Sequence, residues 1–75
     1  MPFPIMEVAS AILESELRTH PVFRGMPYER MGDVVQRVMH RPERRMEADW
    51  RQDALRAAEA VARELDRLGW KGPNA

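Results

Sequence analysis

Basic side chains gather in the middle of the sequence, at a spacing that could bind phosphate. The segment contains Arg37, His40, Arg41, Arg44 and Arg45. Residues 20–46 hold six Arg and three acids, hence a surplus of +3 in a chain whose formal net charge is zero. Because guanidinium groups bind phosphates and release counterions from DNA, this basic corner could contact a nucleic acid. An acidic protein surface or plain solvent would also explain it.

Metal chemistry has little support in the sequence. There is no cysteine, and the only histidines, His20 and His40, lie far apart along the chain. His40 and Glu43 form the best candidate pair, but Pro42 interrupts the helical geometry between them. We therefore expect no metal site and no cofactor.

Pairs of acids also fail to indicate catalysis. Asp49 and Asp53 are one helical turn apart, as are Glu43 and Glu47. Arginines lie at contact spacing from several of these acids, for example Arg51 from Glu47. Such pairs are typical of a solvated helix surface, so we expect no catalytic residue and a protein that is not an enzyme.

The first residues offer one enzymatic alternative. Removal of Met1 would expose Pro2 as a secondary amine beside Phe3, and such an amine can act as a general base. This start resembles the small tautomerases over Met1 to about Val8, which implies Pro2 as the base and a strand, a helix and a second strand after it. The helical pattern from Ile5 does not fit that topology.

The length and composition of the chain indicate what kind of protein carries these residues. The chain has 75 residues, of which 44% are hydrophobic and 32% charged, so we expect one small folded domain. No signal peptide or membrane-spanning run is visible, and the absence of cysteine fits a reducing compartment. We expect a cytoplasmic protein without membrane contact, of the kind that bacteria and their phages encode.

Apolar periodicity predicts an all-α fold, a three-helix bundle over about 4–19, 27–40 and 43–68. The first helix should lie between Pro4 and Pro21, and the second between Pro27 and Pro42. Gly69 suits the C′ position after the third helix, and residues 70–75 should form a frayed tail. The apolar stripe of the third helix is predicted to be Met46, Trp50, Ala54, Ala57, Ala58, Val61, Leu65 and Leu68.

The third helix is too long for a compact globule of this size. A helix of about 25 residues spans roughly 37 Å, whereas 75 residues pack into a sphere about 29 Å across. We therefore expect the helix to overhang and to pack on a protein partner, most simply as a homodimer. Leu55 and Ala62 lie off the main stripe, which makes them candidates for this contact.

Adaptable and aromatic side chains complete the predicted protein interface, which consists of Met26, Tyr28, Met39, Leu55, Ala62 and Trp70. The sequence thus favours a small regulator, adaptor or inhibitor that works through an apolar helical surface. The alternative is a dimeric helical DNA-binding regulator that uses the basic corner Arg37–Arg45.

Overall fold

The chain folds into three α-helices, as the sequence predicts. The structure is a computed structural model that describes residues 3–71, with α1 over Ile5–Thr19, α2 over Tyr28–His40 and α3 over Arg45–Arg67. Residues 3–71 contain no strand. The all-α prediction with a long C-terminal helix is confirmed, and each predicted helix end lies within two residues of the observed one.

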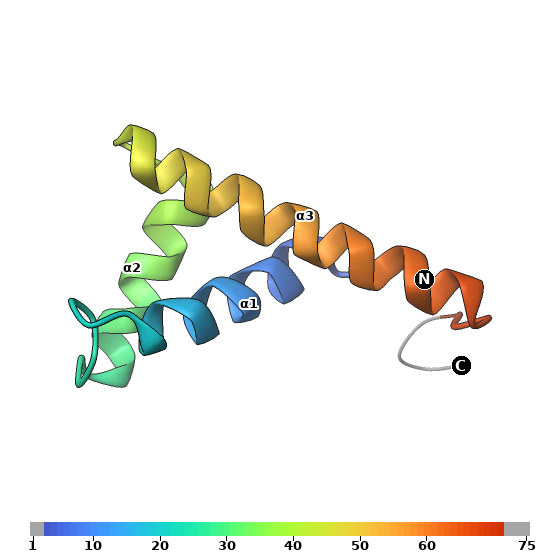
Figure 1. Cartoon of the computed structure of the whole chain (residues 1–75), viewed down its shortest axis with the longest axis horizontal. Helices are drawn as coiled ribbons and strands as arrows, with labels where there is room; N and C mark the ends of the chain where they lie inside the picture. The colour runs from blue at the N-terminus through green and yellow to red at the C-terminus, as the bar shows by residue number, and fades with distance from the viewer. Residues whose placement is uncertain (1–2, 72–75) are drawn as a thin grey trace.

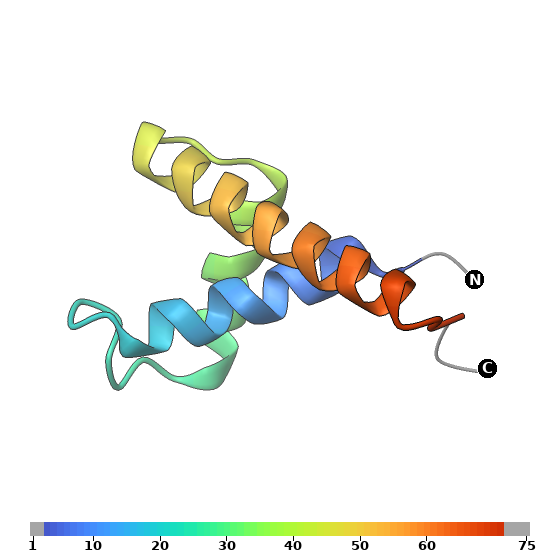
Figure 2. The same ribbon diagram turned by 45° about the vertical axis from the view of Figure 1, so that its right-hand side comes forward.

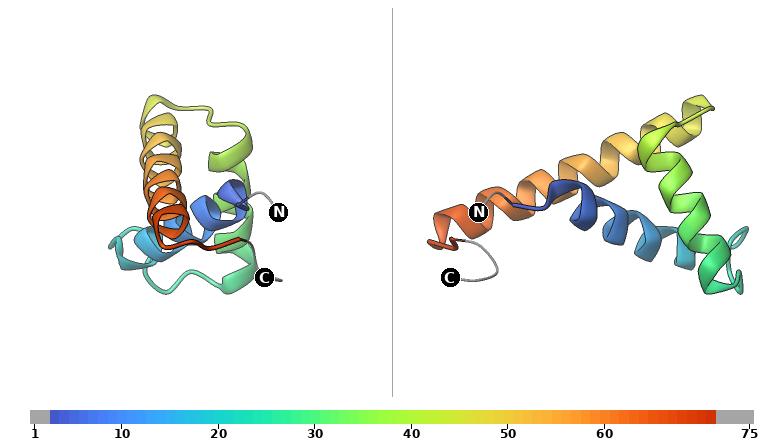
Figure 3. Two further views of the ribbon diagram at one scale, coloured as in Figure 1. Left: turned by 90° about the vertical axis from the view of Figure 1, so that its right-hand side faces the viewer. Right: turned by 180° about the vertical axis from the view of Figure 1, so that it is seen from behind.

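The helices form an open triangle (Figure 1). Helix α2 lies at one end and joins α1 to α3, and α1 packs more extensively against α3 than against α2. Figure 2 shows α1 and α3 crossing, while the right-hand view in Figure 3 shows α3 as the longest edge of the molecule. The arrangement is elongated, with extents of 39 × 24 × 18 Å.

One face of α1 supplies its share of the core. Ala9, Leu13 and Leu17 recur every four residues, so they fall on one side of the helix and are buried. Ile5 packs against this core from the first turn. The helix ends at Thr19 because Pro21 disfavours helical backbone at His20, which is extended.

Helix α2 begins directly after Pro27 and is the most deeply buried of the three along one face. Its buried side chains are Met31, Val35, Val38 and Met39. At its C-terminal end the guanidinium Nε of Arg51 donates a 2.6 Å hydrogen bond to the carbonyl oxygen of Met39. This bond satisfies one of the carbonyls that a helix end leaves without a partner.

Helix α3 ends in a hydrogen-bonded turn. It begins at Arg45, two residues later than predicted. At the other end, Gly69 has φ +83°, the amide of Trp70 donates to the carbonyl of Leu65 and the amide of Gly69 donates to that of Asp66. This is a Schellman motif, so the predicted C′ role of Gly69 is confirmed.

The tail prediction needs a correction at Trp70. Its ring packs edge-on against that of Phe3 with 5.6 Å between centroids, so the folded part reaches at least to this residue. The physical reason is that the Schellman motif turns the chain back toward the segment that precedes α1. Residues 72–75 lie outside the described part of the chain, as does Pro2.

The buried side of α3 differs from the predicted stripe. Ala54 and Ala58 are buried as expected, but Met46, Val61 and Leu68 are 61%, 41% and 66% exposed. Leu55, a predicted interface residue off the main stripe, is half-buried and packs against the core. The buried arc is therefore turned toward Leu55, because α1 and α2 contact α3 from that side.

The length of α3 gives the molecule its shape. Its 23 residues span about 34 Å, and the Cα radius of gyration is 13.6 Å, against about 11 Å for a compact chain of this size. The last turns of α3 extend beyond the start of α1 (Figure 3). Within the described residues, each helix is too short or too polar to cross a lipid bilayer.

Candidate functional site

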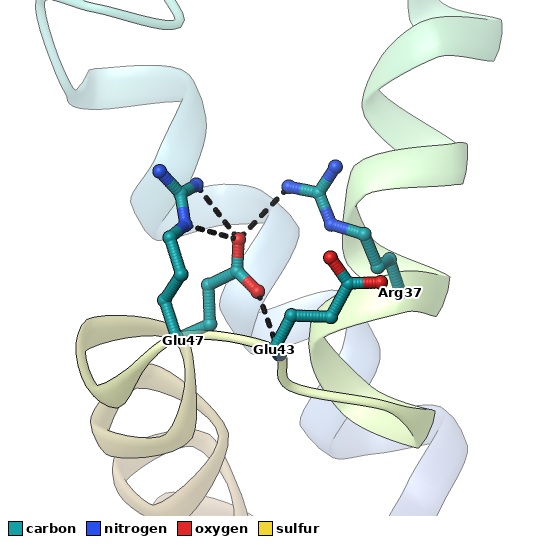
Figure 4. A network of polar contacts seen from close by, with 4 residues as sticks. Arg37, Glu43 and Glu47 are labelled. Carbon is teal, nitrogen blue, oxygen red and sulfur yellow. Dashed lines mark hydrogen bonds and ion pairs between the residues drawn. The ribbon is translucent and has the colours of Figure 1, made fainter.

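A buried carboxylate organises the corner between α2 and α3. Glu47 is only 1% exposed, and its Oε1 accepts hydrogen bonds from Arg37 Nη2 at 3.0 Å and from Arg44 Nη2 at 2.7 Å. Its Oε2 accepts the backbone N–H of Glu43 at 3.0 Å. Figure 4 shows the carboxylate between the two guanidinium groups, one carried by α2 and one by the start of α3.

The position of Glu47 in α3 explains these contacts. It occupies the N3 position of the helix, where a glutamate side chain commonly turns back to a free amide near the helix start. The sequence predicts that Glu47 pairs with Arg51 on a solvated surface, and this is wrong, because Glu47 lies on the same side of α3 as the buried Ala54 and Ala58. The signal that could have found it is an acid three residues after the N-cap, Arg44.

The groups around the carboxyl of Glu47 favour its ionised form over the protonated one. The hydrogen bond from Arg44, the amide of Glu43 and the nearby charge of Arg37 lower the pKa of Glu47 below its ordinary value of 4.5. Desolvation acts in the opposite direction but is outweighed. The cluster is therefore charged at neutral pH and holds α2 to α3.

This arrangement changes the charge of the predicted basic corner. Two of its guanidinium groups, those of Arg37 and Arg44, share the carboxylate of Glu47. Arg41 and Arg45 remain exposed, as does His40. This one carboxylate neutralises one of the two positive charges, and the side chains of Arg37 and Arg44 stay 43% and 70% exposed, so the corner keeps a positive surplus that is smaller than the sequence indicates.

His40 faces a different part of the molecule. It lines an open groove of about 490 Å³ between α1 and α2, together with side chains that include Glu7, Glu14 and Val35. Within residues 3–71, including the lining of this groove, no three His, Asp or Glu side chains are placed so that they could hold a metal ion.

The predicted protein interface is divided between the core and the surface. Met39 is fully buried, so it is a core residue, and Leu55 is half-buried against the core. Tyr28 is 75% exposed, and the guanidinium of Arg18 lies 4.2 Å from its ring centroid. The remaining three, Met26, Ala62 and Trp70, are half-buried.

An exposed apolar strip runs along α3 instead. We define the outer strip of α3 as Met46, Trp50, Ala57, Val61 and Leu68. These positions follow one another at intervals of four or seven residues, which keeps them on one edge of the helix. Met46, Val61 and Leu68 are exposed, and Trp50 and Ala57 are half-buried. Trp50 lies at the edge of the strip, because it also packs against the core and its ring meets that of Phe23 edge-on with 6.1 Å between centroids.

Charged side chains border the outer strip. Asp53 and Arg56 form a 3.7 Å ion pair, and Glu64 pairs with Arg67 farther along α3. The hydrogen bond from Arg67 lowers the pKa of Glu64 below its ordinary value of 4.5. All four side chains are more than half exposed, so they are available to a partner.

No protein-family model matches the sequence, and neither a curated protein nor a solved structure is significantly similar to the chain.

Proposed function

We propose that the protein is a small, non-enzymatic interaction module that acts through the outer strip of α3. It would serve as a regulator, adaptor or inhibitor in the cytoplasm of a bacterium or of a phage-infected cell. The observation that carries this proposal is the alignment of Met46, Val61 and Leu68 on the uncovered edge of the longest helix. Isolated exposed aliphatic side chains are common on protein surfaces, but an aligned row is typical of contact surfaces.

The overhang of α3 supports the same proposal. A chain of this size gains little from a helix whose last turns extend past the helix it packs on, unless something else contacts them. Leu68 lies at this overhanging end and is 66% exposed. A partner on the outer strip would remove its side chain from water.

Protein contacts are better supported than DNA binding. The dimeric DNA-binding alternative needs free guanidinium groups at the α2–α3 corner, and Glu47 takes two of them. The borders of the outer strip carry both signs of charge, which suits a protein surface better than a phosphate backbone.

The proposal is tested by photo-crosslinking from α3 in living cells. A benzophenone amino acid replaces Val61 in one variant and Arg63, which lies on the opposite side of the helix, in a matched control. We expect protein adducts from position 61 and few from position 63. Equal labelling from both positions, or no protein adduct from position 61, would overturn the proposal.

A further inference from the structure

We propose that the partner on the outer strip of α3 is a second copy of this chain, paired antiparallel about a twofold axis between residues 59 and 60. This inference rests on the proposed function and names its partner. It is carried by the order of the charges along α3 and by the register of the apolar side chains between them.

The border charges are complementary to their own reversed order. Along α3 they run acid, base, acid, base at Asp53, Arg56, Glu64 and Arg67, with Ala60 at the centre. Reversal of the direction places Asp53 opposite Arg67 of the second copy, and Arg56 opposite Glu64 of the second copy. A parallel pair would instead place each charge opposite its own kind, which is unfavourable.

The four border charges of α3 are symmetric in their spacing as well as in their signs. Asp53 and Arg67 are each seven residues from Ala60, and Arg56 and Glu64 are each four residues from it. The Asp53–Arg56 ion pair of one copy therefore lies opposite the Glu64–Arg67 ion pair of the second copy, with an acid facing a base in each contact. Two groups of four alternating charges result, one on either side of the axis.

The outer strip gives almost the same register. Antiparallel pairing about this axis places Trp50 opposite Leu68 of the second copy and Ala57 opposite Val61 of the second copy. These apolar pairs and the charge pairs all match to within one residue, about 1.5 Å of helix rise. The alternating intervals of four and seven residues add up to an 11-residue repeat, close to three full turns of an α-helix, so the side chains stay in line along the seam.

The twofold geometry brings the charges to a single edge of the seam. In an antiparallel pair the same flank of each helix meets the other, so the flank with Asp53 and Arg67 faces its own copy. The other flank of α3 carries Ala54 and Ala58 and is occupied by the core of its own chain. The second copy therefore meets α3 beside the core and does not displace α1.

Two charge-reversal variants, measured alone and mixed with each other, test the antiparallel pairing. Asp53→Arg places Arg opposite Arg67 of the second copy, and Arg67→Asp places Asp opposite Asp53 of the second copy. Each variant alone should raise the dimer dissociation constant about tenfold at low salt, since each alters two symmetry-related pairs. An equimolar mixture of the two should regain wild-type affinity as a heterodimer, because both pairs are then attractive.

The control replaces Arg67→Asp by Arg30→Asp, which makes the same charge change at an exposed position in the first turn of α2. Mixed with Asp53→Arg, it should not restore affinity in sedimentation equilibrium. A wild-type chain that is monomeric, a dimer indifferent to both reversals, or equal rescue by Arg30→Asp would each overturn the proposal. Adducts from position 61 to a different protein, with none to the chain itself, would overturn this pairing and leave the proposed function standing.

Discussion

Glu47 shows how one side chain fixes the geometry between two helices. Its carboxylate is almost fully buried, yet each oxygen has a donor, so the charge is compensated where it lies. Removal of the negative charge would leave the guanidinium groups of Arg37 and Arg44 close together without a counter-charge. The corner is therefore more sensitive to this residue than to any exposed acid of α3.

Replacement of Glu47 by Gln should lower the melting temperature at pH 7 clearly more than Glu64→Gln, which alters an exposed pair. The pKa of folded Glu47 lies below the unfolded value near 4.5, so its charge stabilises the fold above that pH. This contribution is lost as the pH falls through the folded pKa. Thermal unfolding at a series of pH values should show the melting temperatures of the wild type and of Glu47→Gln converging in acid. A melting-temperature difference that stays constant down to pH 2 would contradict the role given to the charge.

Two methionines provide a matched test of what is buried. Met31 is fully buried in α2, whereas Met46 is 61% exposed in α3. Met31→Ala should cost about 2–5 kcal/mol of unfolding free energy, and Met46→Ala about 0.5 kcal/mol or less in the monomer. Urea unfolding at low protein concentration measures both. Equal losses would mean that Met46 belongs to the core after all.

Helix existence could be predicted from the sequence, but the rotation of α3 could not. Pro4, Pro21, Pro27 and Gly69 mark helix ends by local chemistry, which a single sequence records directly. The rotation of α3 depends on which arc faces the other helices, and that helix has apolar residues around more than half of its circumference. Leu55 therefore packs against the core, although it was expected outside the main stripe, and Leu68 is exposed, although it was expected within that stripe.

The buried state of Glu47 was missed for a related reason. A helix start at residue 43 places this side chain past the first turn, whereas the actual start at Arg45 places it at N3. Glu47 is buried because it lies seven and eleven residues before Ala54 and Ala58 and so shares their side of α3, and apolar periodicity does not reveal a glutamate at such a position. The basic corner was consequently assigned more free charge than it has.

Two glycines, one just after α3 and one inside α2, should respond in opposite ways to replacement by alanine. Gly69→Ala should destabilise by about 1 kcal/mol, because φ +83° is strained for any residue with a Cβ. Gly32→Ala should stabilise by about 0.5–1 kcal/mol, because it lies inside α2 and its added Cβ would meet no atom within 4 Å. Denaturant midpoints of both variants check the pair, and a loss of stability at Gly32 would show that the α1–α2 groove needs the space.

At the scale of the whole molecule, the shape and the surface chemistry agree. The open triangle leaves one edge of α3 uncovered, and that edge carries both the exposed aliphatic side chains and a charge order that fits its own reverse. Apolar contact would supply most of the affinity, while the charges would select the antiparallel direction.

DNA binding provides a further prediction for the intact protein. With Arg37 and Arg44 held by Glu47, we expect no salt-sensitive affinity for duplex DNA in fluorescence anisotropy at low ionic strength. Binding that weakens with salt and disappears in the double variant Arg41→Glu, Arg45→Glu would contradict this expectation.

The pairing of α3 with a second copy is tested most directly by the solution mass of the unmodified protein, measured by sedimentation equilibrium over a wide range of concentrations. We expect the mass to rise with concentration to twice the 8.7 kDa of one chain and to stop there, because a twofold interface is closed. A mass that stays at 8.7 kDa throughout, or that grows past the dimer without limit, would contradict the pairing.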